Sequence, residues 1–236
     1  MSAAEMVKRL GSMGNPERAR VSRSFFKTGP GEYGEGDQFA GLSVPQVRAL
    51  AKELRDLTRA ETVKLLHAPL HEARLLALLL LMRAYAEGDE KAREGIYGLY
   101  LANTRWINNW DLVDVSATPI VGAHLWARDR SILDALAASD LLWERRIAVL
   151  ATLYFIRRGE FGDTLRIAER LLGDREDLMH KAVGWMLREV GKRDLAAEVG
   201  FLEVHASAMP RTMLRYAIER FPEAERRQYL GRRRHS

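Results

Sequence analysis

The sequence contains no cysteine, no apolar run long enough to cross a membrane, and almost no alternating pattern of the kind that β-strands show. The absence of cysteine excludes a disulfide framework, a thiolate zinc site, an iron–sulfur cluster and a cysteine nucleophile. The longest apolar run, residues 75–82, has eight residues, whereas a membrane span needs about 20. Residues 1–17 lack the apolar core of a secretory signal. We therefore expect a soluble cytoplasmic protein with no membrane partner.

The net charge of +5 is unevenly placed along the 236 residues. Residues 207–236 contain eight arginines and three glutamates, which leaves 29 basic and 29 acidic residues in the rest of the chain. A basic end on a neutral body indicates an anionic partner, nucleic acid first, although short basic tails also serve only solubility. We expect a single domain over residues 1–230, followed by a basic C-terminal tail over residues 231–236.

Helical periodicity predicts an all-α chain of roughly a dozen helices. Asn15 and Pro16 occupy the cap and first-turn positions typical of a helix start. One sizeable loop is expected over residues 28–42, which contain five glycines and a proline. The clearest helical segments are residues 70–86, 89–102, 141–157, 160–172, 175–191, 194–206 and 210–220.

The helices show a repeating order. When Arg74, Asp111, Arg146 and Ala182 are placed at equivalent helical positions, the steps between them are 37, 35 and 36 residues. A helix pair with a period in the mid-thirties is typical of an α-solenoid, and the sequence lacks the tetratricopeptide and ankyrin patterns. We therefore predict a single-domain solenoid of HEAT-like repeats with a concave, basic, DNA-binding face.

Functional residues of such an array should recur about one repeat apart, and one cluster does. Trp110 and Asp114 share a helix face, Arg146 follows Trp110 by 36 residues, and Trp185 follows Arg146 by 39. We expect these four side chains to face one another across adjacent helices. The basic stripe would continue through four further cations: Lys181, Arg188, Arg211 and Arg215. Aromatic rings interleaved with cations suit nucleic acid, although tryptophans in the core and a solvated aspartate are the plainer interpretation.

Other candidate sites are weaker. We expect Trp106, Trp126 and Trp143 to be core residues. His67 and His71 are four residues apart, but Pro69 lies between them and no metalloprotease motif follows, so we predict no metal site. The glycines of residues 28–42 have neither of the nucleotide-binding glycine orders, and we predict no cofactor.

Four segments carry a family resemblance. Residues 109–114 (NWDLVD), 180–189 (HKAVGWMLRE), 209–219 (MPRTMLRYAIE) and 25–45, which include GEYGEGD, resemble the AlkD-type DNA alkylation repair family. Members of that family are HEAT-like repeat DNA glycosylases. The resemblance is collinear over about residues 5–225, and the motifs around Asp114 and Trp185 are specific in combination.

The resemblance implies a role for each matched position. Asp114 would be the catalytic carboxylate, Trp110 and Trp185 the tryptophans beside the lesion, and Arg146 an arginine that contacts DNA near it. Phe25 falls where the family often has tyrosine, and it lacks the hydroxyl that could hydrogen-bond the DNA backbone.

The predicted activity is that of a monofunctional, monomeric DNA glycosylase. It would hydrolyse the N-glycosidic bond of cationic N3- or N7-alkylated purines in double-stranded DNA and leave an abasic site. A non-catalytic binder of damaged or branched DNA is the alternative, and a protein-interaction solenoid is a third interpretation that leaves the Trp–Asp–Arg–Trp set unexplained.

Overall fold

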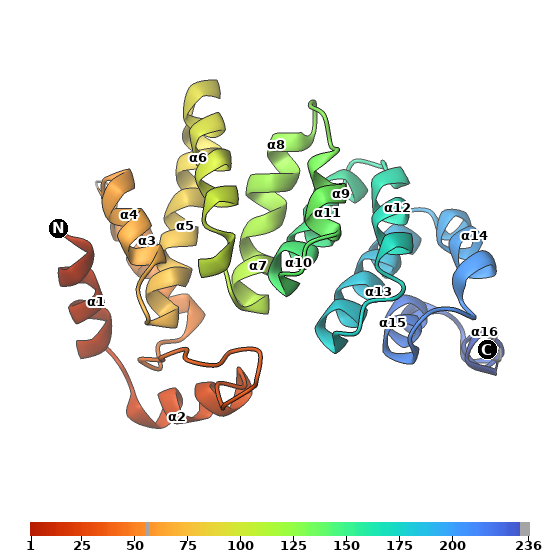
Figure 1. The fold of residues 1–236 in the computed structure, drawn as a ribbon, viewed down its shortest axis with the longest axis horizontal. Helices are drawn as coiled ribbons and strands as arrows, with labels where there is room; N and C mark the ends of the chain where they lie inside the picture. The colour runs from red at the N-terminus through yellow and green to blue at the C-terminus, as the bar shows by residue number, and fades with distance from the viewer. Residues whose placement is uncertain (55–56, 232–236) are drawn as a thin grey trace. The chain divides into compact units, whose positions relative to one another are not determined.

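The computed structural model describes residues 1–54 and 57–231, so residues 232–236 of the predicted tail lie outside the described residues, and Gly231 ends a helix. Over this range the fold is all-helical, as predicted, and the only β-type pairing is an isolated bridge between Gln38 and Leu70 (Figure 1). The chain divides into two compact units, Met1–Ser116 and a second unit that begins at Ala117.

The first unit is built from seven α-helices and one 3₁₀ turn within its described residues. They are α1 (Ala3–Ser12), α2 (Pro16–Phe25), α3 (Val44–Glu53), α4 (Arg59–Leu66), α5 (His71–Glu87), α6 (Glu90–Ala102), the 3₁₀ turn Thr104–Trp106 and α7 (Trp110–Ala117), whose last residue begins the second unit. The predicted start of α2 is confirmed, because the Asn15 side chain accepts a hydrogen bond from the Arg18 N–H and Pro16 follows it.

Helix α5 is the centre of the first unit. Its apolar run is buried on every side, and α3, α4 and α6 all pack against it. A helix that is apolar all round must be covered all round, which explains why its neighbours can be amphipathic while α5 is not. Helix α2 is the opposite case, because Ala19 is its one buried residue, while Val21 and Phe25 are exposed.

The second unit continues as a series of shorter helices. They are a π-helical turn (Thr118–Gly122), α8 (Ala123–Leu125), α9 (Ile132–Ala137), α10 (Leu142–Ala151), α11 (Leu153–Ile156), α12 (Gly162–Arg170), α13 (Asp177–Gly191), α14 (Leu195–His205), α15 (Arg211–Ala217), the 3₁₀ turn Ile218–Arg220 and α16 (Glu223–Gly231).

These helices form two layers. Helices α10, α13 and α15 contact one another in succession, while α9 packs on α10, and both α12 and α14 pack on α13. Gly184 lets α13 and α15 approach closely, because a Cβ at this position would lie 2.4 Å from the Met213 carbonyl oxygen. Arg146 and Ala182, predicted to be equivalent, lie in the neighbouring helices α10 and α13. This stacking of helix pairs is that of an α-solenoid.

The expectation of three core tryptophans is confirmed for one of them. Trp143 is buried, and Trp126 is half-buried against Phe155. The prediction is wrong for Trp106, which is 41% exposed and stacks on the His67 ring at 4.7 Å. Within the described part of the chain, no helix combines the length and apolar character that crossing a bilayer requires.

Candidate functional site

Two of the predicted site residues lie at the start of α7. Trp110 and Asp114 are both half-buried and are separated by one helical turn. The buried Asn109 side chain accepts a hydrogen bond from the Trp110 N–H at 2.9 Å, which orders the first turn. Burial raises the pKa of the fully buried Tyr100 phenol, and the negative charge of Asp114 raises it further. Asp114 is therefore close enough to Tyr100 to influence its ionisation.

An aromatic cluster surrounds Trp110. Phe26, directly after α2, stacks on the indole with ring centroids 5.4 Å apart, and Phe25 meets the same indole edge-on at 6.0 Å. Phe39 and His71 complete the cluster: Phe39 stacks on Phe26 with ring centroids 5.1 Å apart, and the His71 ring is tilted against Phe26 at 5.0 Å. The structure therefore brings the predicted residues Phe25 and Trp110 together, and Phe25 remains 64% exposed at the edge of the cluster.

His71 links this cluster to a buried ionic network. Its Nδ1 lies 3.2 Å from an Asp37 carboxylate oxygen, and its Nε2 lies 2.9 Å from Asp111. Burial alone would lower the pKa of His71, but the hydrogen bonds to Asp111 and Asp37 raise it to about 9. His71 is therefore an imidazolium at neutral pH, with both N–H groups donating to carboxylates.

Asp37 is the carboxylate that connects the members of the network. Arg74 donates to its Oδ1 at 2.7 Å, and Asn108 and Asn109 donate to its two oxygens at 3.2 and 3.5 Å. Arg74 also donates to the Asn108 side chain. Burial would raise the pKa of Asp37, yet the contacts with His71 and Arg74 hold it below its ordinary value. Asp37 is thus a buried carboxylate kept ionised by two cations.

Glu72 holds the end of the glycine-rich loop against α5. Its carboxylate accepts hydrogen bonds from the backbone N–H groups of Ala40, Gly41 and Leu42 at 2.7–3.1 Å. Gly41 is required there, because its φ is +84° and a Cβ would lie 2.2 Å from the Asn15 carbonyl oxygen. The loop that separates α2 from α3 is therefore tightly anchored by charged groups of α5.

Sequence reasoning missed this network. It assessed His71 only as a partner of His67 in a zinc site, whereas His67 contacts Asn103 and His71 contacts two aspartates. A usable signal was present, since His71 and Glu72 open the helix that contains the longest apolar run of the chain and need buried hydrogen-bond partners there. No group of three or more His, Asp or Glu side chains in the described residues is arranged to hold a metal ion.

In the second unit, Arg146 and Trp185 each donate a hydrogen bond to a nearby residue. Arg146 is 4% exposed and donates to the Leu178 carbonyl oxygen at 2.6 Å. Trp185 is half-buried on α13, and its Nε1–H donates to Glu189 one turn later at 3.3 Å. The Arg146 side chain is therefore almost fully buried and is engaged by the protein itself.

The four cations of the predicted stripe differ in their engagement. Lys181 pairs with Asp177 at 2.8 Å, and Arg188 pairs with Glu219. Arg211 is exposed and donates to the Leu230 carbonyl oxygen, while Arg215 is exposed on the same helix, α15. Arg211 and Arg215 are thus the more accessible members of the set.

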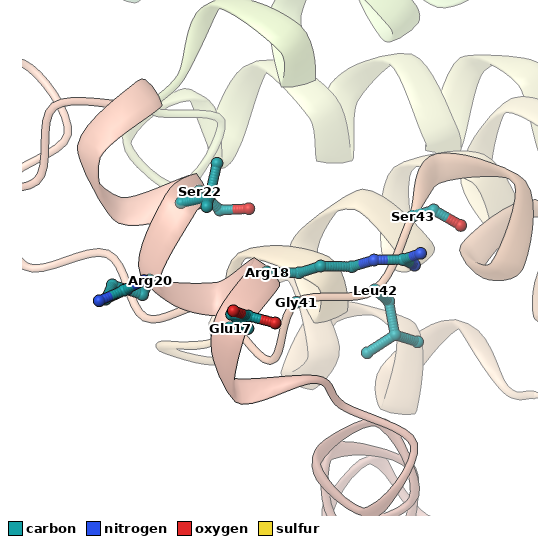
Figure 2. A pocket seen from close by; sticks show the side chains of 8 residues that line it. Glu17, Arg18, Arg20, Ser22, Gly41, Leu42 and Ser43 are labelled. Carbon is teal, nitrogen blue, oxygen red and sulfur yellow. The ribbon is translucent and has the colours of Figure 1, made fainter.

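A separate groove of about 560 Å³ lies between α2 and residues 41–43 (Figure 2). The Arg18 side chain extends along it toward Ser43, whereas Arg20 points away from Ser43. None of the residues predicted from the sequence lines this groove. Its arginines nevertheless add positive charge to α2, the helix that ends in Phe25.

The comparisons with known proteins agree with this architecture. A family model described as "DNA alkylation repair enzyme" matches residues 6–221. The chain belongs to this family. A solved structure described as a predicted DNA alkylation repair enzyme from Enterococcus faecalis is similar to it in fold, with a TM-score of 0.68 and 16% sequence identity over 89% of this chain and 97% of that one. No curated protein matches the sequence. Family membership confirms the resemblance seen in the motifs and places the chain in DNA alkylation repair.

Proposed function

We propose that the chain is a monofunctional DNA glycosylase that removes cationic N3- or N7-alkylated purines from double-stranded DNA. The observation that carries this proposal is the pairing of a half-buried carboxylate, Asp114, with a half-buried indole, Trp110, one turn earlier on α7. Phe25 extends the aromatic surface beside Trp110 to the solvent. This arrangement suits a positively charged substrate, because both the carboxylate and the aromatic faces attract cations.

The chemistry requires little more than charge stabilisation. An alkylated purine is already cationic, so it leaves as a neutral base and needs no acid to protonate it. Positive charge then builds on the deoxyribose, and Asp114 would oppose that charge and orient the attacking water toward C1′. Each cation–π contact contributes about 1–2 kcal/mol when desolvated. Trp110 and Trp185 would therefore favour a charged lesion over a neutral base.

The other predicted residues would bind DNA rather than react with it. Arg146, Lys181, Arg188, Arg211 and Arg215 would contact phosphates, which gives affinity that falls with salt. Phe25 would contact the duplex through its ring alone, because it lacks a hydroxyl. No cofactor and no lysine nucleophile take part in the proposed reaction, so the product is an abasic site without strand cleavage.

The test is base release from duplex DNA that contains 7-methylguanine or 3-methyladenine, quantified by chromatography against DNA incubated without protein. We expect release by the wild type and a loss of roughly 100-fold or more in the single-turnover rate for Asp114→Asn, as for other groups that stabilise transition-state charge. Glu53→Gln, an exposed carboxylate of the same unit, is the matched control and should keep full activity.

The outcomes separate the alternatives. A wild type that binds DNA tightly in a salt-dependent manner but releases no base above the spontaneous rate would be the non-catalytic binder. A wild type without DNA affinity at moderate salt would leave a protein-interaction role. Full activity in Asp114→Asn would remove Asp114 from the mechanism and leave the activity itself in place.

A further inference from the structure

We propose that His71, clamped between Asp37 and Asp111, is a positioning residue that fixes the first turn of α7 and thereby the places of Trp110 and Asp114. The inference rests on the proposed function for its kinetic test, while its structural test is independent of activity. It also assigns a role to the glycine-rich loop, which would carry Asp37 and Phe39 into the interior to complete the clamp.

The clamp works only with a doubly protonated ring. Both nitrogens of His71 face carboxylate oxygens, at 3.2 and 2.9 Å, and the side chain is 3% exposed. A neutral imidazole has one N–H and would leave one of the two contacts without a hydrogen. Loss of the proton would therefore place a lone pair against a buried carboxylate, which is a repulsive arrangement.

The charges around the ring balance. Three charged groups surround the ring: Asp37 from the glycine-rich loop, Asp111 from α7 and Arg74 from α5. From the end of α2, the uncharged ring of Phe26 lies beside it. Two carboxylates thus face two cations. The burial of His71 works against its charge, and the two hydrogen-bonded aspartates more than offset that effect, which keeps the pKa near 9. The imidazolium is the stable form throughout the physiological pH range.

The clamp reaches the reactive groups by two routes. Asp111 directly follows Trp110 and precedes Asp114 by three residues on the same rigid helix, so a shift of Asp111 moves both. The second route runs through the aromatic contacts of Phe26, whose ring centroid lies 5.0 Å from that of the tilted His71 ring and 5.4 Å from that of the stacked Trp110 ring. Misplacement of catalytic groups by about 1 Å costs up to roughly 100-fold in rate, so a small shift at His71 would be visible in the chemistry.

The anchoring of the loop supports the same conclusion. Glu72, next to His71 on α5, holds three consecutive backbone N–H groups of residues 40–42. The backbone of Gln38 is also tied to this region. Its carbonyl oxygen accepts a hydrogen bond from the backbone N–H of His71 at 2.8 Å, and its backbone N–H donates to the Pro69 carbonyl oxygen. The backbone beside Asp37 is therefore fixed, which keeps the Asp37 carboxylate in place against His71.

The kinetic experiment uses single-turnover release of 7-methylguanine from duplex DNA between pH 6 and 10, corrected at each pH for DNA without protein. In the wild type we expect the rate to fall as the pH rises through about 9. His71→Gln should lose that fall, react roughly 10- to 100-fold more slowly near neutral pH, and bind lesion-containing DNA within about threefold of the wild type. Asp37→Asn keeps the shape of the side chain but removes one negative charge, so it should move the fall to lower pH.

The matched control is Asp163→Asn in the second unit. Asp163 is a partly buried carboxylate paired with Arg130 and Arg166, so its loss costs stability without touching the clamp. It should leave both the rate and the pH profile unchanged. A His71→Gln protein that is folded and retains the wild-type rate and alkaline fall would overturn the proposal.

The structural experiment is ¹⁹F NMR of protein labelled with 5-fluorotryptophan, which gives one signal for each of the five tryptophans. The Trp110 signal is assigned by its loss in Trp110→Phe. We expect it to shift as the pH passes about 9 in the wild type and to be insensitive to that pH in His71→Gln, with the buried Trp143 as a steady reference. A Trp110 signal that does not respond in the wild type would refute the clamp. A wild type without glycosylase activity would refute only the proposed function, because this signal still reports on His71.

Discussion

Each unit buries a side chain whose pKa lies well above its ordinary value, His71 in the first unit and Glu198 in the second, and the causes are opposite. His71 in the first unit is 3% exposed, and its pKa reaches about 9 because two carboxylates stabilise the charged form. Glu198 in the second unit is 2% exposed, and its pKa reaches about 8 because burial destabilises the charged form. One group is held charged by partners, and the other is held neutral for want of them.

Glu198 lies on α14 against the backbone of Gly191. A Cβ at residue 191 would lie 1.6 Å from the Glu198 Oε2, so only glycine leaves room for the carboxyl group. The Oε1 atom has no hydrogen-bond partner within the described chain, and the nearby Arg188, whose charge lowers the pKa, pairs with Glu219. The carboxyl group lines a cavity of about 270 Å³. Burial without a partner is the costly state for a charge, so the two residues should respond oppositely to neutral replacement.

The largest effect is expected for His71→Gln. The folded-state pKa of about 9 exceeds the ordinary 6.5, so the stabilisation is fully present below pH 6.5 and is lost as the pH rises through 9. The shift corresponds to a free energy on the order of 3 kcal/mol. His71→Gln should therefore be less stable than the wild type by about that amount at pH 6 and approach it above pH 9, as measured by urea unfolding monitored by circular dichroism.

His67→Gln is the control for this comparison. Its ring is exposed and contacts the neutral side chain of Asn103 rather than a carboxylate, so its replacement should change the unfolding free energy by less than about 1 kcal/mol at any pH. An equal loss in both variants would mean that ring packing, and not the ion pairs, accounts for the role of His71.

The next effect has the opposite sign and is expected for Glu198→Gln. The folded-state pKa of about 8 exceeds the ordinary 4.5, so the folded protein keeps a proton that the unfolded chain releases. The resulting penalty grows from pH 4.5 to 8 and then levels off. The substitution would remove a penalty on the order of 4 kcal/mol but leave an amide without a partner, which costs about 1–3 kcal/mol. We expect a net stabilisation of about 2 kcal/mol at pH 8, measured by the same urea unfolding.

Glu203→Gln serves as the control on the same helix. Glu203 is exposed and accepts a hydrogen bond from Tyr229, and a glutamine side chain can accept the same bond, so the change should be within about 0.5 kcal/mol. Destabilisation of Glu198→Gln at pH 8 would show that the Glu198 carboxyl group is satisfied after all and that the contrast between the two units fails.

The fold was predictable because it depends on local periodicity. The expected helices over 70–86, 89–102 and 175–191 correspond to α5, α6 and α13 within three residues at each end. The spacing of Arg146 and Ala182 likewise anticipated the stacking of α10 on α13. These features follow from apolar residues one turn apart, which is information that a short stretch of sequence contains.

The candidate site was predictable only where its contacts are local in sequence. Trp110 and Asp114 share a helix face, which spacing alone reveals, and the contact of Trp185 with Glu189 is similarly local. The partners of Asp37, in contrast, lie 34 to 72 residues away along the chain. Such pairings are decided by how the loop folds over α5, and no periodic pattern encodes them. The aspartate in the GEGD sequence could be seen, but its partners could not.

The smallest effect is expected where a site residue is held by surface contacts. Glu189 accepts from Trp185 at 3.3 Å and pairs with Lys192 and Arg193, directly after α13, at 2.5 and 3.1 Å; each partner is three or four residues away along the chain. Burial would raise the pKa of Glu189, but the hydrogen bonds from Lys192 and Arg193 lower it, so these contacts persist above its ordinary pKa of 4.5 and weaken as the pH falls through the lowered value.

Glu189→Gln should therefore cost less than about 1 kcal/mol at pH 7, because both cations are partly solvated and the glutamine oxygen can still accept from the indole. Urea unfolding at low and high salt measures this cost, and most of it should disappear in 1 M salt, where the Debye length falls to about 3 Å. The ¹⁹F signal of Trp185 should stay near its wild-type position. A large shift would mean that Glu189 orients Trp185 as strictly as the buried clamp orients Trp110. The distinction between a tryptophan positioned by a buried network and one positioned by contacts near its own helix would then no longer hold.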